Sequence, residues 1–431
     1  MNTGQFYING SWVNPLEQET FDVINPATER SAAKISMAGT ADVELAVQAA
    51  RSAFPEYMAT TVEQRLGWFS RLLEIYRRRA PEITQAMCTE MGSPLSFTEE
   101  VQTPCGDGHI EVIMEVLAGF EFDTLSPRGG SRVLHEPVGV AALITPWNWP
   151  VNQVVVKVLP ALAAGCTCIL KPSEESPLSA MIFAEMIDEA GFPAGAFSLI
   201  NGSGLLAGAA LAAHPDVDMV SFTGSTRAGI AVAKTAADTV KRVTLELGGK
   251  SPNLLFADAD LVSAVSWSVE ACFSNAGQTC DAPTRLLVER SVYEQAKEIA
   301  TRIAQATKVG DPSVAGDHIG PVVNARQYDN IQRLIQQGID EGANLLAGGT
   351  GRADDREVGY YVKPTLFADV DNDMTINKQE IFGPVLCMMP FDTEDEAIRL
   401  GNDTDYGLGA CIQTSDPVRA DRVARKLRAG T

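Results

Sequence analysis

Val138-Gly-Val-Ala-Ala-Leu-Ile-Thr-Pro-Trp-Asn-Trp-Pro150 is a short apolar run that ends in a stiff turn of two prolines and two tryptophans. Its first part, residues 138–144, predicts a buried β-strand. The chain beyond it alternates between apolar runs and helical patterns. Strands are expected at 166–171, 197–201, 219–223 and 243–247, and helices at 225–237 and from the N-cap pair Ser176-Pro177 to Ala190. This alternation predicts a parallel sheet covered by helices.

A second alternating series follows Gly248-Gly249, where we place a domain boundary. Its strands are expected at 253–256, 285–289, 362–367, 385–391 and 408–414, and its helices at 259–272 and 293–307. The chain is therefore expected to be an α/β protein with two parallel-sheet domains.

The first part of the chain is expected to be helical after a short β start. Apolar residues share one helical face over 42–54 and again over 66–76. Pro81 is expected to open the next helix, because proline is tolerated in a first turn, and Gly92 to close it. The Pro-Cys-Gly-Asp-Gly stretch at 104–108 is expected to break a helical pattern, which resumes near 110 and ends at 119.

Composition excludes several classes of function. The 431 residues are 45% hydrophobic, enough to bury a large core. The formal net charge of −21 argues against a nucleic-acid partner and against an anionic membrane surface. The N-terminus lacks the basic and apolar regions of a signal peptide, and Lys157, Pro160 and Gly165 interrupt the longest apolar stretch. We therefore expect neither a signal peptide nor a membrane span.

Eight cysteines spread over a chain of this length are typical of a reduced protein, so we expect a cytoplasmic location. Cys166 and Cys168, the only close pair, would face opposite sides of a strand and cannot easily share a metal. The four histidines show no zinc spacing, and no metal site is expected.

Three residues stand in positions that suit chemistry. Cys280 lies in a polar segment between a helix and a strand, where a thiol with a lowered pKa can act as a nucleophile, although the position alone favours an ordinary free thiol. Glu246 interrupts a strand expected to be buried, which suits a general base, or it is a paired carboxylate at a strand end. Asn148 follows a strand, where its amide can stabilise an oxyanion or simply satisfy the turn.

Two further segments follow strands and suit a cofactor. Lys171-Pro-Ser-Glu174 offers charged groups for ribose hydroxyls, and Phe222-Thr-Gly-Ser-Thr-Arg-Ala-Gly229 leads through glycine into a helix start that can bind a pyrophosphate. Neither is the usual G-x-G-x-x-G fingerprint, and each alone could be an ordinary turn.

The order of the motifs is more specific than any single one. Six motifs follow one another along the chain: Thr-Pro-Trp-Asn, Lys-Pro-Ser-Glu, Phe-Thr-Gly-Ser-Thr, Leu-Glu-Leu-Gly-Gly-Lys, Gly-Gln-Thr-Cys and Glu-Ile-Phe-Gly-Pro. Together they resemble the aldehyde dehydrogenase superfamily, whose members are NAD(P)-dependent, and the resemblance extends from Tyr7 to the last residue.

The resemblance implies roles for individual residues. Cys280 would be the nucleophile, Glu246 the base, Asn148 part of the oxyanion hole, and Lys157 part of a proton relay. The residues implied at the cofactor are Trp147, Lys171, Ser173, Glu174, Gly204, Gly208, Gly224, Ser225, Glu380 and Phe382. The implied reaction oxidises an aldehyde to a carboxylic acid through a thiohemiacetal and a thioester on the cysteine.

The resemblance also implies a domain plan. Residues 1–120 and 138–248 would form the cofactor domain, 121–137 an incomplete β oligomerisation arm, and 249–431 a truncated catalytic domain. NAD is the expected cofactor, because Glu174 would crowd a ribose 2′-phosphate, with NADP as the alternative. The family forms homodimers or homotetramers; since this sequence stops before the family's final segment, we expect a poorly active and weakly oligomeric chain.

Two other functions stay open. A coenzyme-A-acylating semialdehyde dehydrogenase is disfavoured by Glu246, which such members do not use. A non-catalytic member of the family is supported only by the truncation.

Some features bear on the small-molecule aldehyde substrate. Asp281 beside Cys280 is unusual, and its charge should raise the thiol pKa if the two side chains converge. Trp149 adds an aromatic wall, and the stretch at 104–108 falls where the family's tunnel-lining helix lies. These features favour a bulky or aromatic aldehyde, with Trp149 and Asp281 as substrate residues.

Overall fold

The computed structural model describes residues 2–431, in which the chain divides into two compact units. Unit 1 comprises the residues up to Asn25, Arg30–Met91 and Leu95–Glu246. Unit 2 comprises Pro26–Glu29, Gly92–Pro94 and Leu247–Thr431. The main part of unit 2 thus begins close to the glycine pair at which we expected a boundary.

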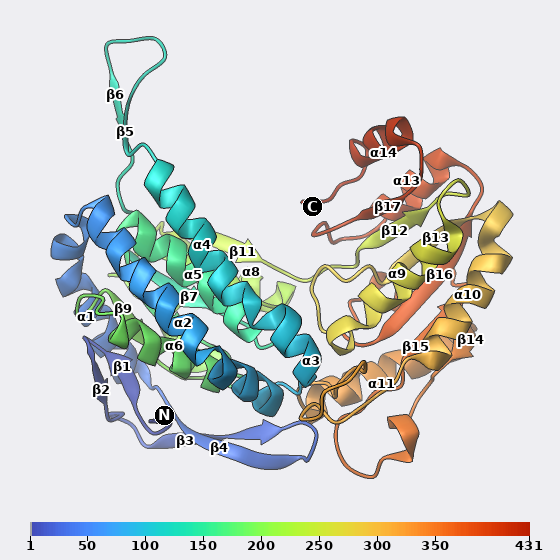
Figure 1. The fold of residues 1–431 in the computed structure, drawn as a ribbon, viewed down its shortest axis with the longest axis horizontal. Helices are drawn as coiled ribbons and strands as arrows, with labels where there is room; N and C mark the ends of the chain where they lie inside the picture. The colour runs from blue at the N-terminus through green and yellow to red at the C-terminus, as the bar shows by residue number, and fades with distance from the viewer. Residues whose placement is uncertain (1) are drawn as a thin grey trace. The chain divides into compact units, whose positions relative to one another are not determined.

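Unit 1 is built on a seven-stranded sheet in the order β11-β10-β7-β8-β9-β1-β2 (Figure 1). Its strands are β1 (Phe6–Ile8), β2 (Ser11–Val13), β7 (Val140–Ile144), β8 (Thr167–Lys171), β9 (Phe197–Leu199), β10 (Met219–Thr223) and β11 (Arg242–Glu246). Neighbours from β11 to β9 pair in parallel, whereas β1 is antiparallel to both β9 and β2. All residues of β7 and β8 are buried, as expected for strands covered on both faces.

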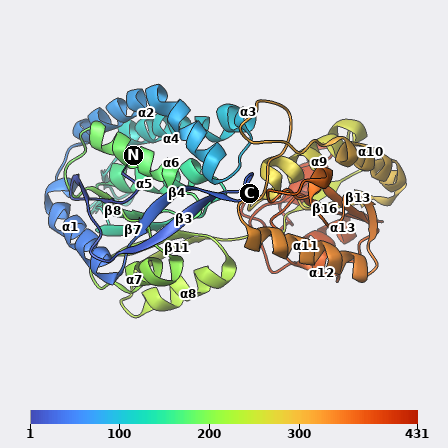
Figure 2. The same ribbon diagram turned by 90° about the horizontal axis from the view of Figure 1, so that it is seen from below.

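Helices cover both faces of this sheet. They are α1 (Thr40–Met58), α2 (Val62–Glu90), α3 (Leu95–Phe97), α4 (Pro104–Gly119), α5 (Pro150–Ala164), α6 (Leu178–Glu189), α7 (Ala209–Ala213) and α8 (Thr226–Ala237), with π-helical turns η1 (Thr98–Gln102) and η2 (Gly204–Gly208). Figure 2 shows α2, α4 and α6 on one side of the sheet and α7 and α8 on the other. Large apolar side chains of α2, α5 and α6 form the main core with β7 and β8.

Two hairpins complete unit 1. Strands β3 (Glu19–Asn25) and β4 (Arg30–Met37) form one antiparallel pair, with the turn residues between them assigned to unit 2. Strands β5 (Asp123–Leu125) and β6 (Arg132–Leu134) form the other, which projects from the end of α4 (Figure 1). This second hairpin lies within the segment expected to form the β arm.

Unit 2 is built on a six-stranded sheet in the order β14-β15-β16-β13-β12-β17. Its strands are β12 (Pro252–Leu255), β13 (Arg285–Glu289), β14 (Asn344–Ala347), β15 (Thr365–Ala368), β16 (Val385–Phe391) and β17 (Cys411–Gln413), and only β14 pairs antiparallel. The longer helices are α9 (Leu261–Phe273), α10 (Tyr293–Ala306), α11 (Ala325–Asp340), α13 (Glu394–Asn402) and α14 (Pro417–Ala424), with one short helix, α12 (Thr375–Lys378).

Alternation along β16 shows how this sheet is buried on both faces. Leu386 and Met388 pack in one core with α9 and α10, whereas Cys387 and Met389 pack in a second core with α11 and α13. Figure 2 shows these two helix layers on opposite sides of the sheet. The confirmed fold class is therefore α/β with two mostly parallel sheets.

The expectations for the first helices were partly wrong. Pro81 lies inside α2, which continues to Glu90 because its buried apolar face outweighs one lost backbone hydrogen bond. The stretch at 104–108 does not break a helix: Pro104 is the first residue of α4, a position that needs no N–H partner.

Two further details differ from expectation. Ser176 does not cap α6: the N-cap residue is Pro177, whose side chain makes no cap hydrogen bond. Strand β11 is not buried on both faces but lies at the edge of its sheet, with Glu246 exposed. Among residues 2–431, no helix combines the length and the apolarity needed to span a membrane.

Candidate active site

Cys280 follows a reversal of the chain in unit 2. The 3-10 turn η3 (Ser274–Gly277) contains three successive residues with positive φ, 54° at Asn275, 55° at Ala276 and 72° at Gly277. Any side chain at Gly277 would clash, since a Cβ there would lie 2.0 Å from the carbonyl oxygen of Gly383. Strain concentrated in one buried loop is typical of a functional segment.

Gln278 holds this loop, a role that the sequence analysis missed. Its Oε1 accepts a hydrogen bond from the backbone N–H of Val323 at 2.9 Å, and its Nε2 donates to the carbonyl of Asn275 at 3.0 Å. Gln278 is 1% exposed, so both bonds are shielded from water. The sequence signal for this role is a glutamine that follows a turn made of small residues.

The Cys280 thiol is partly buried and has acidic neighbours. Burial, followed by the charges of Asp281 and Glu380, raises the pKa of Cys280 to about 11. The upward shift of the thiol pKa agrees with the effect expected of the Asp281 charge. The free thiol is thus protonated near neutral pH, and its activation requires a change that stabilises the thiolate.

Glu380 is placed by the two glycines after β11. Its Oε1 accepts from the backbone N–H of Gly249 at 3.1 Å, and a Cβ on Gly248 would lie 2.1 Å from Oε2. Burial raises the pKa of Glu380. A Cβ on Gly249 would meet the carbonyl oxygen of Cys280 at 2.3 Å. Because these two glycines have no side chains, the Glu380 carboxylate and the backbone of Cys280 can both approach them closely.

The remaining predicted residue of unit 2 is Phe382, which has a φ of 58°. Gln327 on α11 donates from Nε2 to its carbonyl at 2.9 Å. Cys280, Glu380 and Phe382 come before β13 and β16, which are parallel neighbours, so these residues lie toward the amino ends of the strands.

The predicted residues of unit 1 lie at the opposite end of their strands. Asn148 follows β7, Lys171 ends β8, Gly224 follows β10, and Glu246 ends β11. Because these four strands are parallel and in register, their carboxyl ends share one edge of the sheet, the usual ligand edge of such sheets.

Asn148 is well sheltered at this edge. Asn148 lies in the turn that leads into α5 and is 3% exposed. Trp149 is the N-cap residue of α5, and its ring packs edge-on against Phe97 with 5.7 Å between centroids. Trp147 is partly exposed in the same turn.

Lys157 and Glu246 interact electrostatically within unit 1. The Nζ of Lys157 donates to Ser221 Oγ at 2.9 Å. Burial lowers the pKa of Lys157 to about 8, against the opposing effect of the Glu246 charge. A lysine of this pKa can exchange protons near neutral pH.

The two cofactor segments have the expected local structure. Lys171 donates from Nζ to the carbonyls of Pro172 at 2.7 Å and Gly202 at 2.9 Å, with Glu174 Oε2 at 3.7 Å. Lys171 thus orders the loop that carries Ser173 and Glu174.

Ser225 caps α8, accepting on its side chain from Ala228 N. Gly224 lies between strand and helix, where a Cβ would be 2.7 Å from the Phe222 ring. Gly204 and Gly208 bound η2, and a Cβ on Gly204 would meet open space.

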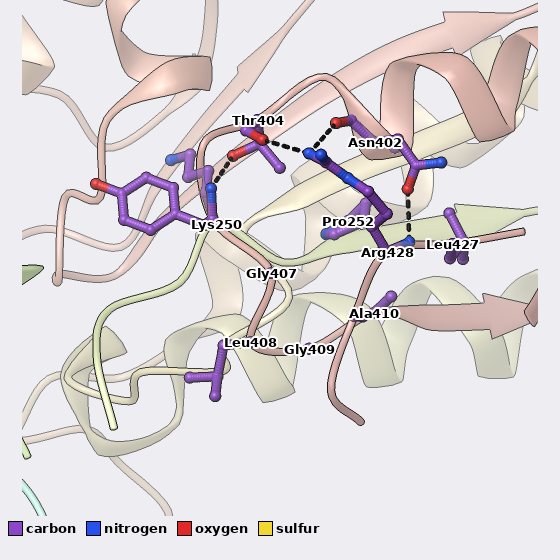
Figure 3. Close-up of a pocket in the computed structure, with 13 residues that line it drawn as sticks. Lys250, Pro252, Asn402, Thr404, Gly407, Leu408, Gly409, Ala410, Leu427 and Arg428 are labelled. Carbon is purple, nitrogen blue, oxygen red and sulfur yellow. Dashed lines mark hydrogen bonds between the residues drawn. The ribbon is translucent and has the colours of Figure 1, made fainter. Parts of the chain in front are cut away.

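A pocket in unit 2 adjoins the segment that carries Cys280 and Asp281 (Figure 3). A Cβ on Gly409, which lines the pocket, would lie 3.4 Å from Asp281 Cβ. It is lined by the 401–410 segment, residues 427–429, Pro252 and Lys250. Arg428 closes one side by donating to Asn402 and Thr404. The Nζ of Lys250 is buried without a hydrogen-bond partner in the part of the chain that the structure describes. The pocket contains none of the predicted site residues.

No metal-binding cluster of His, Cys, Asp and Glu occurs within residues 2–431, and all eight cysteines are free thiols.

Known proteins resemble this chain over nearly its whole length. The model of the aldehyde dehydrogenase family matches residues 12–431. A 3-succinoylsemialdehyde-pyridine dehydrogenase from a Pseudomonas species is 47% identical, covering 99% of this chain and 89% of its own length.

Two crystal structures, each with a TM-score of 0.98, agree with this assignment. An aldehyde dehydrogenase from Bartonella henselae is 50% identical over 99% of this chain and 90% of its own. A cysteine-to-alanine variant of aldehyde dehydrogenase C from Pseudomonas syringae, complexed with NAD+ and octanal, is 48% identical over 100% of this chain and 88% of its own. The chain, as its six ordered motifs indicated, belongs to the aldehyde dehydrogenase family of enzymes.

Proposed function

We propose that this enzyme oxidises an aldehyde to a carboxylic acid with NAD+, using Cys280 as the nucleophile. The observation that carries the proposal is the Cys280 loop, in which three left-handed residues and Gln278 present a partly buried thiol on a polar segment. The similar structure that contains NAD+ and octanal supports the same class of reaction.

The residues of unit 1 fit a dinucleotide. The first N–H groups of α8 have no partner within the helix and suit a pyrophosphate, and Gly224 allows its close approach. Glu174 carries a partly exposed carboxylate that suits ribose hydroxyls. The other proposed cofactor residues of unit 1 are Trp147, Lys171, Ser173, Gly204, Gly208 and Ser225, and those of unit 2 are Glu380 and Phe382. NAD+, when bound, supplies the hydride acceptor.

The protein residues supply the remaining chemistry. The Cys280 thiol releases its proton to water, and the thiolate sulfur forms a bond to the aldehyde carbon as the second bond of the carbonyl group opens. The side-chain amide of Asn148 donates to the resulting oxyanion, an effect worth about 3 kcal/mol in comparable sites. After oxidation to the thioester, Glu246 removes a proton from the attacking water. Lys157, with its lowered pKa, relays that proton.

The decisive experiment compares the wild type with Cys280→Ala in NADH production from a panel of aldehydes. Wild-type enzyme should produce NADH and the variant should not, while both keep the same melting temperature. Equal rates would disprove the nucleophile assignment.

Glu246→Gln separates acylation from hydrolysis. Acylation does not use the Glu246 carboxylate, so a first burst of NADH should persist. Steady turnover should fall by about 100-fold or more, because the water loses its base. Rapid mixing checks this, and a vanished burst would contradict the assignment.

We also propose that the β5–β6 hairpin, as the family's arm, mediates self-association, and that the enzyme acts in the cytoplasm. The first rests on the exposed apolar residues of the hairpin, of which Leu125 is 75% and Leu134 59% exposed. The second rests on eight dispersed cysteines in a long chain.

A further inference from the structure

A serine on β10 contacts the lysine that the proposed mechanism uses as a relay. Lys157 Nζ, on α5, and Ser221 Oγ are 2.9 Å apart, and Lys157 is 8% exposed. Ser221 lies between Val220 and Phe222, which are both buried in the core. A hydroxyl group both donates and accepts hydrogen bonds, so Ser221 can receive one proton while it gives up another.

The register of β10 and β11 places Glu246 on the same face of the sheet as Ser221. In these parallel strands Ser221 pairs with Thr244, and Thr223 pairs with Glu246. Residues two apart in a strand share a face, and so do residues directly opposite in a parallel neighbour. All four side chains therefore point to one face of the sheet.

The same face is the one that α5 covers. Ser221 also pairs with Leu143 of β7, which belongs to the core cluster that includes the buried valines of α5. From the spacing of strands and residues, the Cα atoms of Ser221 and Glu246 are about 8 Å apart, a diagonal that long side chains bridge. The charge of Glu246 also acts on Lys157. Ser221 thus lies between the proposed base and the lysine.

Resting on the proposed function, we infer that the Ser221 hydroxyl carries the proton of the hydrolytic water from Glu246 to Lys157. Glu246 first takes this proton as the water oxygen bonds to the thioester carbon. The O–H bond of Glu246 then breaks as its proton bonds to Ser221 Oγ, while the original proton of Ser221 bonds to the free amine of Lys157. Glu246 is a carboxylate again, Ser221 is unchanged, and the Lys157 ammonium releases its proton to water. Ser221 touches no substrate, so it is a positioning residue that acts through Glu246.

Ser221→Ala removes the hydroxyl, and Ser221→Thr keeps it. With an aldehyde that the wild type oxidises, Ser221→Ala should keep the first burst of NADH, but its steady turnover should fall by about tenfold or more. Ser221→Thr should restore most of the turnover. Thr244→Val is the matched control, because it removes the hydroxyl directly opposite on β11, and it should behave like the wild type. Unchanged turnover of Ser221→Ala, or an equal loss in Ser221→Thr, would overturn the inference.

The pH profile separates a relay from a structural role. The neutral amine of Lys157 accepts the proton, and the pKa of Lys157 is about 8, so steady turnover of the wild type should rise as the pH increases through about 8. Among the described residues, the charge that acts on Lys157 is that of Glu246. Ser221→Ala should lose this rise, since Lys157 no longer receives the proton. An equal rise in both proteins would contradict the relay.

A double-mutant cycle tests whether Ser221 acts through Glu246. In the Glu246→Gln background, Ser221→Ala should have little further effect on steady turnover, because both changes interrupt the path of the same proton. Fully additive losses would show that Ser221 only supports the fold.

An activated ester distinguishes failure of this inference from failure of the proposed function. Without NAD+, p-nitrophenyl acetate should acetylate the Cys280 thiolate and release p-nitrophenolate, and water must then hydrolyse the thioester. Intact-mass measurements should show acetyl-enzyme decaying about tenfold more slowly in Ser221→Ala than in the wild type. If no aldehyde is oxidised, the proposed function fails, and this decay decides the inference by itself: equal rates overturn it. A Cys280 that is never acetylated would overturn both.

Discussion

At the scale of single residues, the chemistry depends on how each side chain is sheltered. Burial raises the pKa of Cys280 and of Glu380 and lowers the pKa of Lys157, so in each case it favours the uncharged form. The residue types could be recognised from the ordered motifs. Their environments could not, because burial depends on side chains that are distant in sequence.

Asp281→Asn tests the electrostatic environment of Cys280. Asp281 disfavours the thiolate, so its neutralisation should lower the pKa of Cys280 below about 11. Alkylation by iodoacetamide at pH 8 should then be faster by about two- to fivefold, a modest effect because Asp281 is exposed to screening. Asp281→Glu, which keeps the charge, should react like the wild type. A slower reaction of Asp281→Asn would contradict this account.

At the scale of secondary-structure elements, the N-terminus of α6 is capped by a residue of α2. The carboxylate of Glu90 accepts from Leu178 N at 2.5 Å, from Ser179 N at 3.1 Å and from Ser179 Oγ at 2.6 Å. The local pattern favours Ser176 as the cap residue, but Ser176 does not cap α6. A cap that is 88 residues away in sequence leaves no local signal.

Glu90 should make stability depend on pH. Burial raises the pKa of Glu90 to about 7, although its hydrogen bonds oppose the shift. The folded protein therefore holds a proton that the unfolded chain releases above about pH 4.3. This stabilisation is complete below that pH and is lost as the pH rises through about 7.

Glu90→Gln should remove this dependence while retaining an acceptor oxygen. The free energy of unfolding of the wild type should fall between pH 5 and pH 8 by roughly 2–3 kcal/mol more than that of the variant. Urea unfolding at both pH values checks this. Identical pH dependence in the two proteins would show that Glu90 does not titrate in this range.

At the scale of the whole molecule, the β5–β6 hairpin projects from the end of α4 (Figure 1). An isolated two-stranded hairpin is marginally stable in water, and this one exposes Leu125 and Leu134. Self-association would cover these side chains and pair the free strand edges.

Leu125→Lys with Leu134→Lys should weaken that association. Light scattering across a range of concentrations should show wild-type oligomers and a variant shifted toward the monomer mass. Thr124→Lys in the same hairpin is the control for added charge, since Thr124 is only partly exposed. A wild type that stays monomeric at all concentrations would rule out the arm.

The sequence by itself determined the alternation of strands and helices and the approximate ends of elements such as β10, β13 and β16, and it singled out the residues that we propose for the chemistry. Periodicity and turn residues are local, so these features can be recognised along the chain. Only the tertiary structure decided that α2 continues through Pro81, that β11 lies at a sheet edge, and that Glu90 caps α6. Each depends on contacts between residues far apart in sequence, whose combined packing free energy outweighs local preference.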